Sequence, residues 1–209
     1  RGGSDHSQVM WRPKEYSKAG TKVNVSGNLT GLPTSSHRWI THDVKGSFQV
    51  GQARIVKIYI NKHKMDVLQD GNVVRTIPVT TGKPGASTTT RSGTKVIIER
   101  DATRIMDSST VGIPKGSSDY YHLKVKYAMR VTYTGEFIHA APWSERPQAS
   151  ANGSHGCVGL STEHARWLFN FCAAGDPVIN SGSNRMFKPD EGIGCWCYDW
   201  SGWQKLSAV

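Results

Sequence analysis

Long apolar segments are missing from this 209-residue sequence. No run approaches the roughly 18 consecutive apolar residues that a membrane-spanning helix needs, and residues 1–6 contain no apolar stretch like that of a signal peptide. We therefore interpret the chain either as a cytosolic protein or as one from which a targeting segment has been removed. Hydrophobic residues still make up 37% of the sequence, which is enough for a packed core in one domain or two.

Acidic residues are scarce, because 16 Asp and Glu stand against 26 Lys and Arg and give a net charge of +10. Such a charge attracts polyanions, either nucleic acid or an anionic cell wall or membrane surface. The basic residues are scattered along the chain, and the sequence has no zinc-finger spacing, aromatic RNA-binding signature or long Lys/Arg run. Charge alone selects no partner, and without those signatures we expect no nucleic acid to bind.

Cysteine is also rare. The four cysteines are Cys157, Cys172, Cys195 and Cys197, too few to form a disulfide scaffold in a chain of this size. The Cys195-Trp196-Cys197 tripeptide lacks a second pair of ligands, so it favours buried or mutually bridged thiols over a metal site. We expect neither a metal nor a cofactor.

The first quarter of the chain has the pattern of a β-sandwich fragment. Residues 21–25 and 46–50 alternate in polarity, and clusters of Gly, Pro, Asn and Ser separate such stretches. This segment holds only about half of the roughly 100 residues of a full immunoglobulin-like sandwich. We therefore predict that residues 1–52 form a partial immunoglobulin-like domain and that its N-terminal part lies outside this sequence.

Strand patterns dominate the middle of the chain, and Asp70-Gly71 between two of them predicts a tight hairpin. The predicted strands cover residues 55–60, 65–68, 73–79, 95–99, 121–131 and 135–139. Residues 80–86, which include Lys83, predict a loop at the rim of a site, without the spacing of a phosphate-binding loop.

One helix stands out after these strands. Residues 161–164 resemble a capped helix start, apolar residues follow at spacings of three and four, and Gly175 can end the helix. We predict a β-rich catalytic domain over residues 53–180 with this one main helix. Residues 181–209 are rich in Gly and Trp and predict a small C-terminal subdomain that packs on a neighbouring surface.

The densest group of chemically useful residues lies between Phe137 and Leu160. His139 ends a predicted strand, and Cys157 lies in a predicted turn. A thiol becomes a good nucleophile once it is ionised, which a neighbouring imidazole can promote. Gly156 allows a sharp turn, and the amides of Gly156 and Cys157 could form an oxyanion hole. Residue types alone fit equally well a small buried thiol beside two structural histidines.

The spacing of these residues decides between the two interpretations. His139, fourteen intervening residues and then Ser154-His155-Gly156-Cys157 resemble the signature of the YkuD-type L,D-transpeptidases. Residues 104–114 and 137–144 are similar to stretches of the mycobacterial-type members. Those proteins place an immunoglobulin-like module before the catalytic domain and a short Trp-containing subdomain after it, so the resemblance covers nearly the whole chain.

The resemblance implies a reaction in peptidoglycan synthesis. The thiol of Cys157 attacks the carbonyl between the third and fourth residues of a stem tetrapeptide, D-Ala leaves, and a neighbouring stem amine resolves the thioester into a 3-3 cross-link. It further implies stem peptides as partners, carbapenem β-lactams as covalent inhibitors, and a part in wall biogenesis and cell shape. We accordingly expect an extracytoplasmic location in the cell envelope, with attachment to the membrane through a missing N-terminal segment or to the wall.

The resemblance also assigns roles to residues. His139 matches the base, Ala140 the residue whose carbonyl orients that base, Tyr121 a tyrosine that stabilises the oxyanion, and Met106 a methionine of the donor pocket. The expected catalytic residues are Cys157, His139, His155, Gly156 and Ala140, and the expected substrate-binding residues are Tyr121, Met106, Trp143 and Ser154. Aromatic residues of β domains are mainly buried, which favours packing over sugar stacking for Trp143, Tyr120 and Tyr127. The other histidines lack partners at a recognisable spacing.

Two positions depart from the family pattern. Gly159 stands where the family has Asn, and Ala140 stands where close relatives have Ser. The Ala140 change matters little if only the carbonyl is used, whereas Gly159 lacks a side-chain amide that could fix the turn. We predict altered reactivity toward substrates or β-lactams, with the chemistry retained.

Three rival interpretations remain open. A cell-wall peptidase would let water resolve the same thioester, and a wall-binding protein would carry a decayed site, for which Gly159 is the best argument. A zinc site formed by His139, His155 and Cys157 has suitable ligand types but lacks the close ligand pairs that are usual in zinc sites.

Overall fold

The computed structural model describes residues 10–35, 37–144, 148 and 150–206, so residues 1–6, considered above for a signal peptide, lie outside the described part. The chain divides into two compact units, residues 1–53 and residues 54–209. Strands make up 39% and helices 16% of the structure, which confirms the prediction of a mainly β fold.

The first unit consists of two small antiparallel sheets. Strand β1 (Lys22–Gly27) pairs with β4 (Val44–Gln49), and β2 (Pro33–Ser35) pairs with β3 (Arg38–Trp39). The alternating stretches at 21–25 and 46–50 thus form strands, as their pattern indicates. The side chain of Phe48 remains 54% exposed, because a two-stranded sheet has no second layer of its own to cover it.

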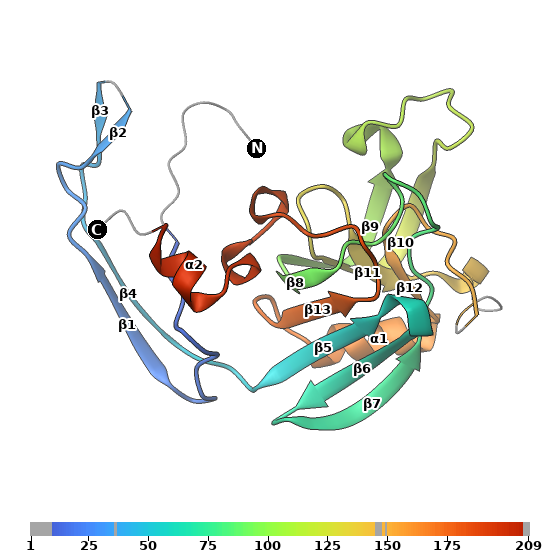
Figure 1. The fold of residues 1–209 in the computed structure, drawn as a ribbon, viewed down its shortest axis with the longest axis horizontal. Coiled ribbons are helices and arrows are strands. Elements are labelled where there is room, and N and C mark those ends of the chain that lie inside the picture. The colour runs from blue at the N-terminus through green and yellow to red at the C-terminus, as the bar shows by residue number, and fades with distance from the viewer. Residues whose placement is uncertain (1–9, 36, 145–147, 149, 207–209) are drawn as a thin grey trace. The chain divides into compact units, whose positions relative to one another are not determined.

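The second unit contains two sheets, and the first of them has five strands. Its order is β7 (Asn72–Pro78), β6 (Lys64–Gln69), β5 (Arg54–Tyr59), β13 (Pro177–Ser181) and β8 (Gly93–Val96), as Figure 1 shows. The predicted hairpin joins β6 to β7, and Asp70 and Gly71 both have positive φ angles, +50° and +83°. Asp and Gly tolerate this conformation, which suits the twist of a tight hairpin.

The second sheet has four strands in the order β12 (Val158–Leu160), β11 (Phe137–Ala140), β10 (His122–Arg130) and β9 (Glu99–Asp107). The prediction of one strand over residues 95–99 was wrong. The chain leaves one sheet after β8, which pairs with β13, and enters the other at β9, which pairs with β10. Ile97 lies between them and is 1% exposed, so an unbroken apolar pattern conceals the change of sheet.

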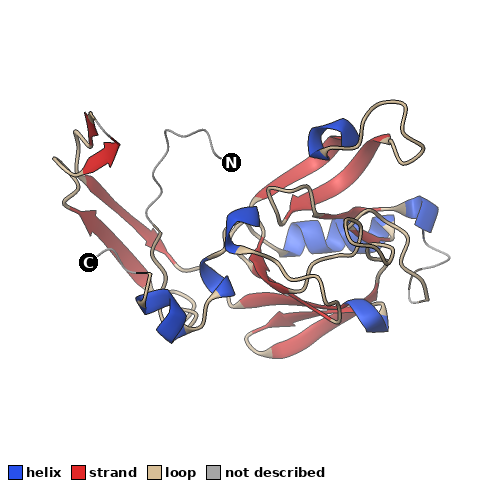
Figure 2. Ribbon diagram, turned by 45° about the horizontal axis from the view of Figure 1, so that its top comes forward, coloured by secondary structure: helices blue, strands red, loops and turns tan. Residues whose placement is uncertain are grey.

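The main helix, α1 (Thr162–Phe171), starts as the capping pattern predicts, because the hydroxyl of Ser161 accepts a hydrogen bond from the amide of His164 at 3.2 Å. Ala165 and Leu168 on one face of α1 enter a single core that both sheets of the unit share. Figure 2 shows α1 among the strands of this unit, and the other helical segments are short: η1 (Ile60–Lys62), η2 (Ser108–Val111), η3 (Pro142–Ser144), η4 (Pro189–Glu191), η5 (Cys195–Cys197) and α2 (Trp200–Gln204).

The segment after β13 runs beside the residues that precede β8. The amide of Ser92 donates to the carbonyl of Arg185, and the amide of Phe187 donates to the carbonyl of Ser92, both at 2.8 Å. The four cysteines are free thiols. Among the described residues, no helix has the length and apolar character required to cross a membrane.

Candidate active site

A cavity of about 310 Å³ lies where the ends of β11 and β12 meet the surrounding loops. Seven of the nine site residues expected from the sequence line it: Met106, Tyr121, His139, Trp143, Ser154, His155 and Cys157. The other two, Ala140 and Gly156, directly follow His139 and precede Cys157 in the chain. The motif residues therefore meet in one site.

Strand pairing brings the imidazole and the thiol together. Strands β11 and β12 are parallel and place His139 opposite Gly159, two residues beyond Cys157. The thiol-bearing turn therefore ends beside the strand that carries the histidine. Both side chains are withdrawn from solvent, with Cys157 7% and His139 6% exposed.

The backbone fixes the orientation of His139. Its Nδ1 lies 2.8 Å from the carbonyl oxygen of Ala140, and since a carbonyl only accepts, Nδ1 carries the proton and Nε2 is the basic nitrogen. Burial lowers the pKa of His139 from its ordinary value of 6.5. The imidazole is therefore neutral at pH 7 and able to accept a proton.

The thiol of Cys157 keeps its proton in the resting site. Burial raises the pKa of Cys157 to about 12, although a backbone hydrogen bond with Phe137 acts in the opposite direction. The Sγ atom lies 3.6 Å from the carbonyl oxygen of Gly135, to which the thiol donates. The sequence suggested an imidazole that lowers the thiol pKa, but a neutral imidazole in a buried site provides no positive charge to do so. A base must instead remove the proton during attack.

The turn before Cys157 is held by the hydroxyl of Ser154, which donates to the carbonyl oxygen of Cys157 at 2.6 Å and accepts from the amide of Gly156 at 3.1 Å. Gly156 has a φ of +120°, where L side chains are strained. Its amide is thus engaged, whereas the described residues contain no acceptor for the amide of Cys157. Of the two amides expected in an oxyanion hole, that of Cys157 is the available one.

One rim of the cavity carries charged and aromatic groups. Nε2 of His155 lies 3.4 Å from Asp119, whose carboxylate also pairs with Lys83 at 3.2 Å. The ring of Tyr121 lies 5.4 Å from that of His155, measured between centroids. Burial raises the pKa of Tyr121 to about 12, so its hydroxyl retains a proton that it can donate.

The cavity lining also includes an exposed indole, that of Trp143. Trp143 is 59% exposed, and its ring centroid lies 6.1 Å from that of His139. The prediction that Trp143 is a packing residue was therefore wrong. Tyr127 does pack against the core, with its ring 5.8 Å from Phe169.

The neighbours of Gly159 explain why this position carries Gly where the family has Asn. Gly159 and Thr80 exchange two backbone hydrogen bonds, of 2.9 and 3.1 Å. A Cβ atom at Gly159 would lie 2.6 Å from the Thr80 hydroxyl, 3.0 Å from the Ala141 Cβ and 3.2 Å from the Ser144 hydroxyl. The two hydroxyls, 3.4 Å apart, lie so close to this Cβ position that they leave no room for an Asn side chain. Sequence analysis missed Thr80 and Ser144, because neither belongs to the signature.

We expect the Gly159→Asn variant to be acylated by a carbapenem about tenfold more slowly or worse, because the new side chain must displace Thr80 or shift the strand beside His139. The time course of adduct formation by intact mass measures this rate. The double variant Gly159→Asn/Thr80→Ala, which removes the closest clash, should recover part of it. Unchanged kinetics in the single variant would count against this account of the site.

No group of three His, Cys, Asp or Glu side chains in the described part of the chain is arranged to hold a metal ion. The fold and the cavity define a thiol–imidazole site at the end of a parallel strand pair. The chain belongs to the YkuD family, because the model of the L,D-transpeptidase catalytic domain matches residues 53–179. This match confirms the resemblance recognised in the sequence.

Known relatives extend the match beyond the catalytic domain. L,D-transpeptidase 5 of Mycobacterium tuberculosis is 34% identical over 205 residues, 97% of this chain and 44% of that protein. L,D-transpeptidase 1 of the same species is 37% identical over 172 residues, 76% of this chain and 68% of that protein. Two curated relatives match nearly the whole of this chain, but the chain spans only about half of their length, 44% of one and 50% of the other.

Solved structures share the fold. An L,D-transpeptidase from Mycobacterium smegmatis has a TM-score of 0.68 at 34% identity, and the match covers 81% of this chain and 71% of that one. The LD transpeptidase LdtMt1 in complex with imipenem has a TM-score of 0.65 at 34% identity, with 77% and 82% covered.

Proposed function

We propose that this protein is a peptidoglycan L,D-transpeptidase that forms 3-3 cross-links through a thioester on Cys157. One observation carries the proposal: Cys157 and a neutral His139, anchored through Nδ1, line the same cavity. Membership of the family supports stem peptides as substrates, and the relative in complex with imipenem supports carbapenems as inhibitors.

In the first step the Sγ atom of Cys157 forms a bond to the carbonyl carbon between the third and fourth stem residues, while Nε2 of His139 takes the thiol proton. The carbonyl oxygen becomes an oxyanion, and we propose that the amide of Cys157 and the hydroxyl of Tyr121 stabilise it. The intermediate then collapses, the C–N bond breaks, and His139 returns the proton to the amine of the departing D-Ala. A thioester remains.

In the second step an amine of a neighbouring stem attacks the thioester carbon, and Nε2 of His139 takes a proton from that amine. The C–S bond breaks as the new amide bond forms, and the proton passes from His139 to the sulfur. The free thiol is restored, and the product is a cross-linked dimer that lacks one D-Ala.

Product analysis with a stem tetrapeptide tests this function. We expect mass spectrometry to show a dimer whose mass equals two tetrapeptides minus one D-Ala. The control is a tetrapeptide whose side-chain amine is acetylated. This peptide can still form the thioester as a donor, but it cannot attack a thioester as an acceptor. If the free-amine substrate gave tripeptide as its sole product, the reaction would be hydrolysis and not transfer. If the protein neither turned over the substrate nor formed a carbapenem adduct, the site would be a decayed one.

We further propose that residues 1–52 belong to an immunoglobulin-like domain, residues 53–180 to the catalytic domain and residues 181–209 to a C-terminal subdomain. The exposed apolar side chains on the sheets of the first unit support a larger β domain there. Family membership supports an extracytoplasmic site of action. We also propose peripheral attachment to the membrane or to the cell wall.

A further inference from the structure

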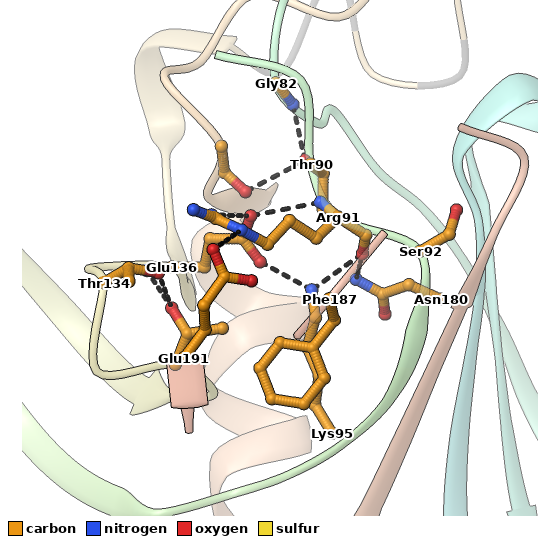
Figure 3. A network of polar contacts seen from close by, with 12 residues as sticks. Gly82, Thr90, Arg91, Ser92, Lys95, Thr134, Glu136, Asn180, Phe187 and Glu191 are labelled. Atoms are coloured by element: carbon orange, nitrogen blue, oxygen red, sulfur yellow. Dashed lines mark hydrogen bonds and ion pairs between the residues drawn. The ribbon is translucent and has the colours of Figure 1, made fainter. Parts of the chain in front are cut away.

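The hydroxyl of Thr90 links its own segment to two others, one at Gly82 and one at Gly156, the residue before the nucleophile. The side chain of Thr90 is buried, with 1% of the residue exposed, and its hydroxyl accepts from the amide of Gly82 at 2.8 Å and donates to the carbonyl of Gly156 at 2.9 Å. Figure 3 shows the bond from Gly82 to Thr90. A Cβ atom at Gly82 would lie 1.9 Å from the carbonyl oxygen of Thr88 and 3.0 Å from the Cα of Gly156. The three segments therefore meet backbone to backbone.

The bond to Gly156 acts on the peptide that links Gly156 to Cys157. Among the described residues no peptide bond is cis, and in a trans peptide the C=O and N–H bonds point in opposite directions. Because Thr90 holds the carbonyl of Gly156, the amide of Cys157 points away from Thr90. That amide is the one without a protein acceptor among the described residues, and Cys157 lines the cavity.

Thr90 is itself fixed by a buried ionic network that starts at the next residue (Figure 3). The amide and the guanidinium of Arg91 donate to one carboxylate oxygen of Glu136, at 3.1 and 2.9 Å. Lys95, which is 0% exposed, donates to the other oxygen at 2.5 Å and to the carbonyl of Arg91 at 2.8 Å. Such buried charges persist only when they are paired and hydrogen-bonded, so the backbone at residue 91 has little freedom to move.

The C-terminal segment completes this network. The carboxylate of Glu191 accepts from Nε of Arg91 at 2.9 Å, which balances the two buried cations with two carboxylates. The hydroxyl of Ser183 donates to the carbonyl of Thr90 at 2.7 Å. The guanidinium of Arg185 donates to the carbonyl of Thr89 at 2.8 Å. Residues 183–191 thus hold the chain on both sides of Thr90.

We propose that Thr90 is a positioning residue that orients the amide of Cys157 toward the oxyanion, and that residues 183–191 hold it in place through the Arg91–Glu191 pair. This inference rests on the proposed acyl transfer. The segment after β13 thereby contributes to catalysis indirectly, because it fixes Thr90, which orients the backbone amide of Cys157.

Two reactions of the same thiol separate this role from a merely structural one. Acylation by a carbapenem develops an oxyanion, whereas alkylation by iodoacetamide displaces iodide from a saturated carbon and develops none. We expect Thr90→Val, which has nearly the same shape and no hydroxyl, to lower the acylation rate about 10- to 100-fold, with alkylation within about twofold of the parent. Thr90→Ser retains the hydroxyl and should restore acylation.

Glu191→Gln is a second variant that leaves Thr90 in place, and it should show a smaller loss of the same selective kind. Circular dichroism and thermal unfolding verify the fold of each variant. Equal loss of acylation and alkylation, or equal acylation in Thr90→Val and the parent, would overturn the role of Thr90. If Thr90→Val does not fold, unchanged acylation in Glu191→Gln would overturn the proposal. A parent that is alkylated but not acylated, by carbapenem or tetrapeptide, would overturn both this inference and the proposed function.

Discussion

The Cys157→Ala variant is expected to gain no mass on incubation with a carbapenem, whereas the parent gains the mass of one β-lactam molecule. Only Cys157 combines a free thiol with a place in the cavity beside His139. The acyl bond cannot form without its sulfur, so the loss should be complete. Intact mass spectrometry of the two proteins after the same incubation measures it.

Cys172 offers a matched control, because its thiol is also free and buried, and burial likewise raises its pKa to about 12. Cys172 lies in the core and does not line the cavity. Cys172→Ala should therefore form the adduct as the parent does. An adduct on Cys157→Ala would move the nucleophile elsewhere and contradict the assignment of the site.

Replacing the base is expected to have the next largest effect. His139→Ala should lower the acylation rate at pH 7 by about 10²- to 10⁴-fold, the usual contribution of general base catalysis. The thiol, with a pKa of about 12, would have to ionise unaided. Single-turnover mass spectrometry gives the rates, and His122→Ala, at the exposed first residue of β10, is the control with an unchanged rate.

The pH dependence of the acylation rate further distinguishes the parent from His139→Ala. Burial lowers the pKa of His139 below 6.5, and only the neutral imidazole accepts a proton. The parent rate should therefore be constant near pH 7 and fall only once the pH drops below 6.5. In His139→Ala that acidic limb should disappear, and the rate should rise with pH toward the thiol pKa of about 12. A rate in His139→Ala that matches the parent and keeps its acidic limb would remove His139 from the mechanism.

Local patterns predicted the elements whose signals lie within a few residues. Ser161 caps α1 because its hydroxyl can reach an amide three residues along the chain. Asp70 and Gly71 form the hairpin turn because both tolerate a positive φ. The spacing of His139 and Cys157 identified the family, and the matching family model confirms it.

Interactions between distant segments were not predictable in the same way. Lys95 has the residue type of an exposed position, yet it is fully buried because Glu136, 41 residues away, pairs with it. Thr90 carries no motif, and its bond to Gly156 spans 66 residues. The change of sheet at Ile97 leaves no local signal either.

The sequence by itself determined the family, the mainly β class, the identity of the thiol and imidazole, and the capped helix, because each depends on residue type and short spacing. Only the tertiary structure decided the protonation of Cys157 and His139, the hydroxyls that require glycine at position 159, and the buried ions behind the nucleophile. Those properties follow from burial and from hydrogen-bond partners, which exist only once remote parts of the chain pack together.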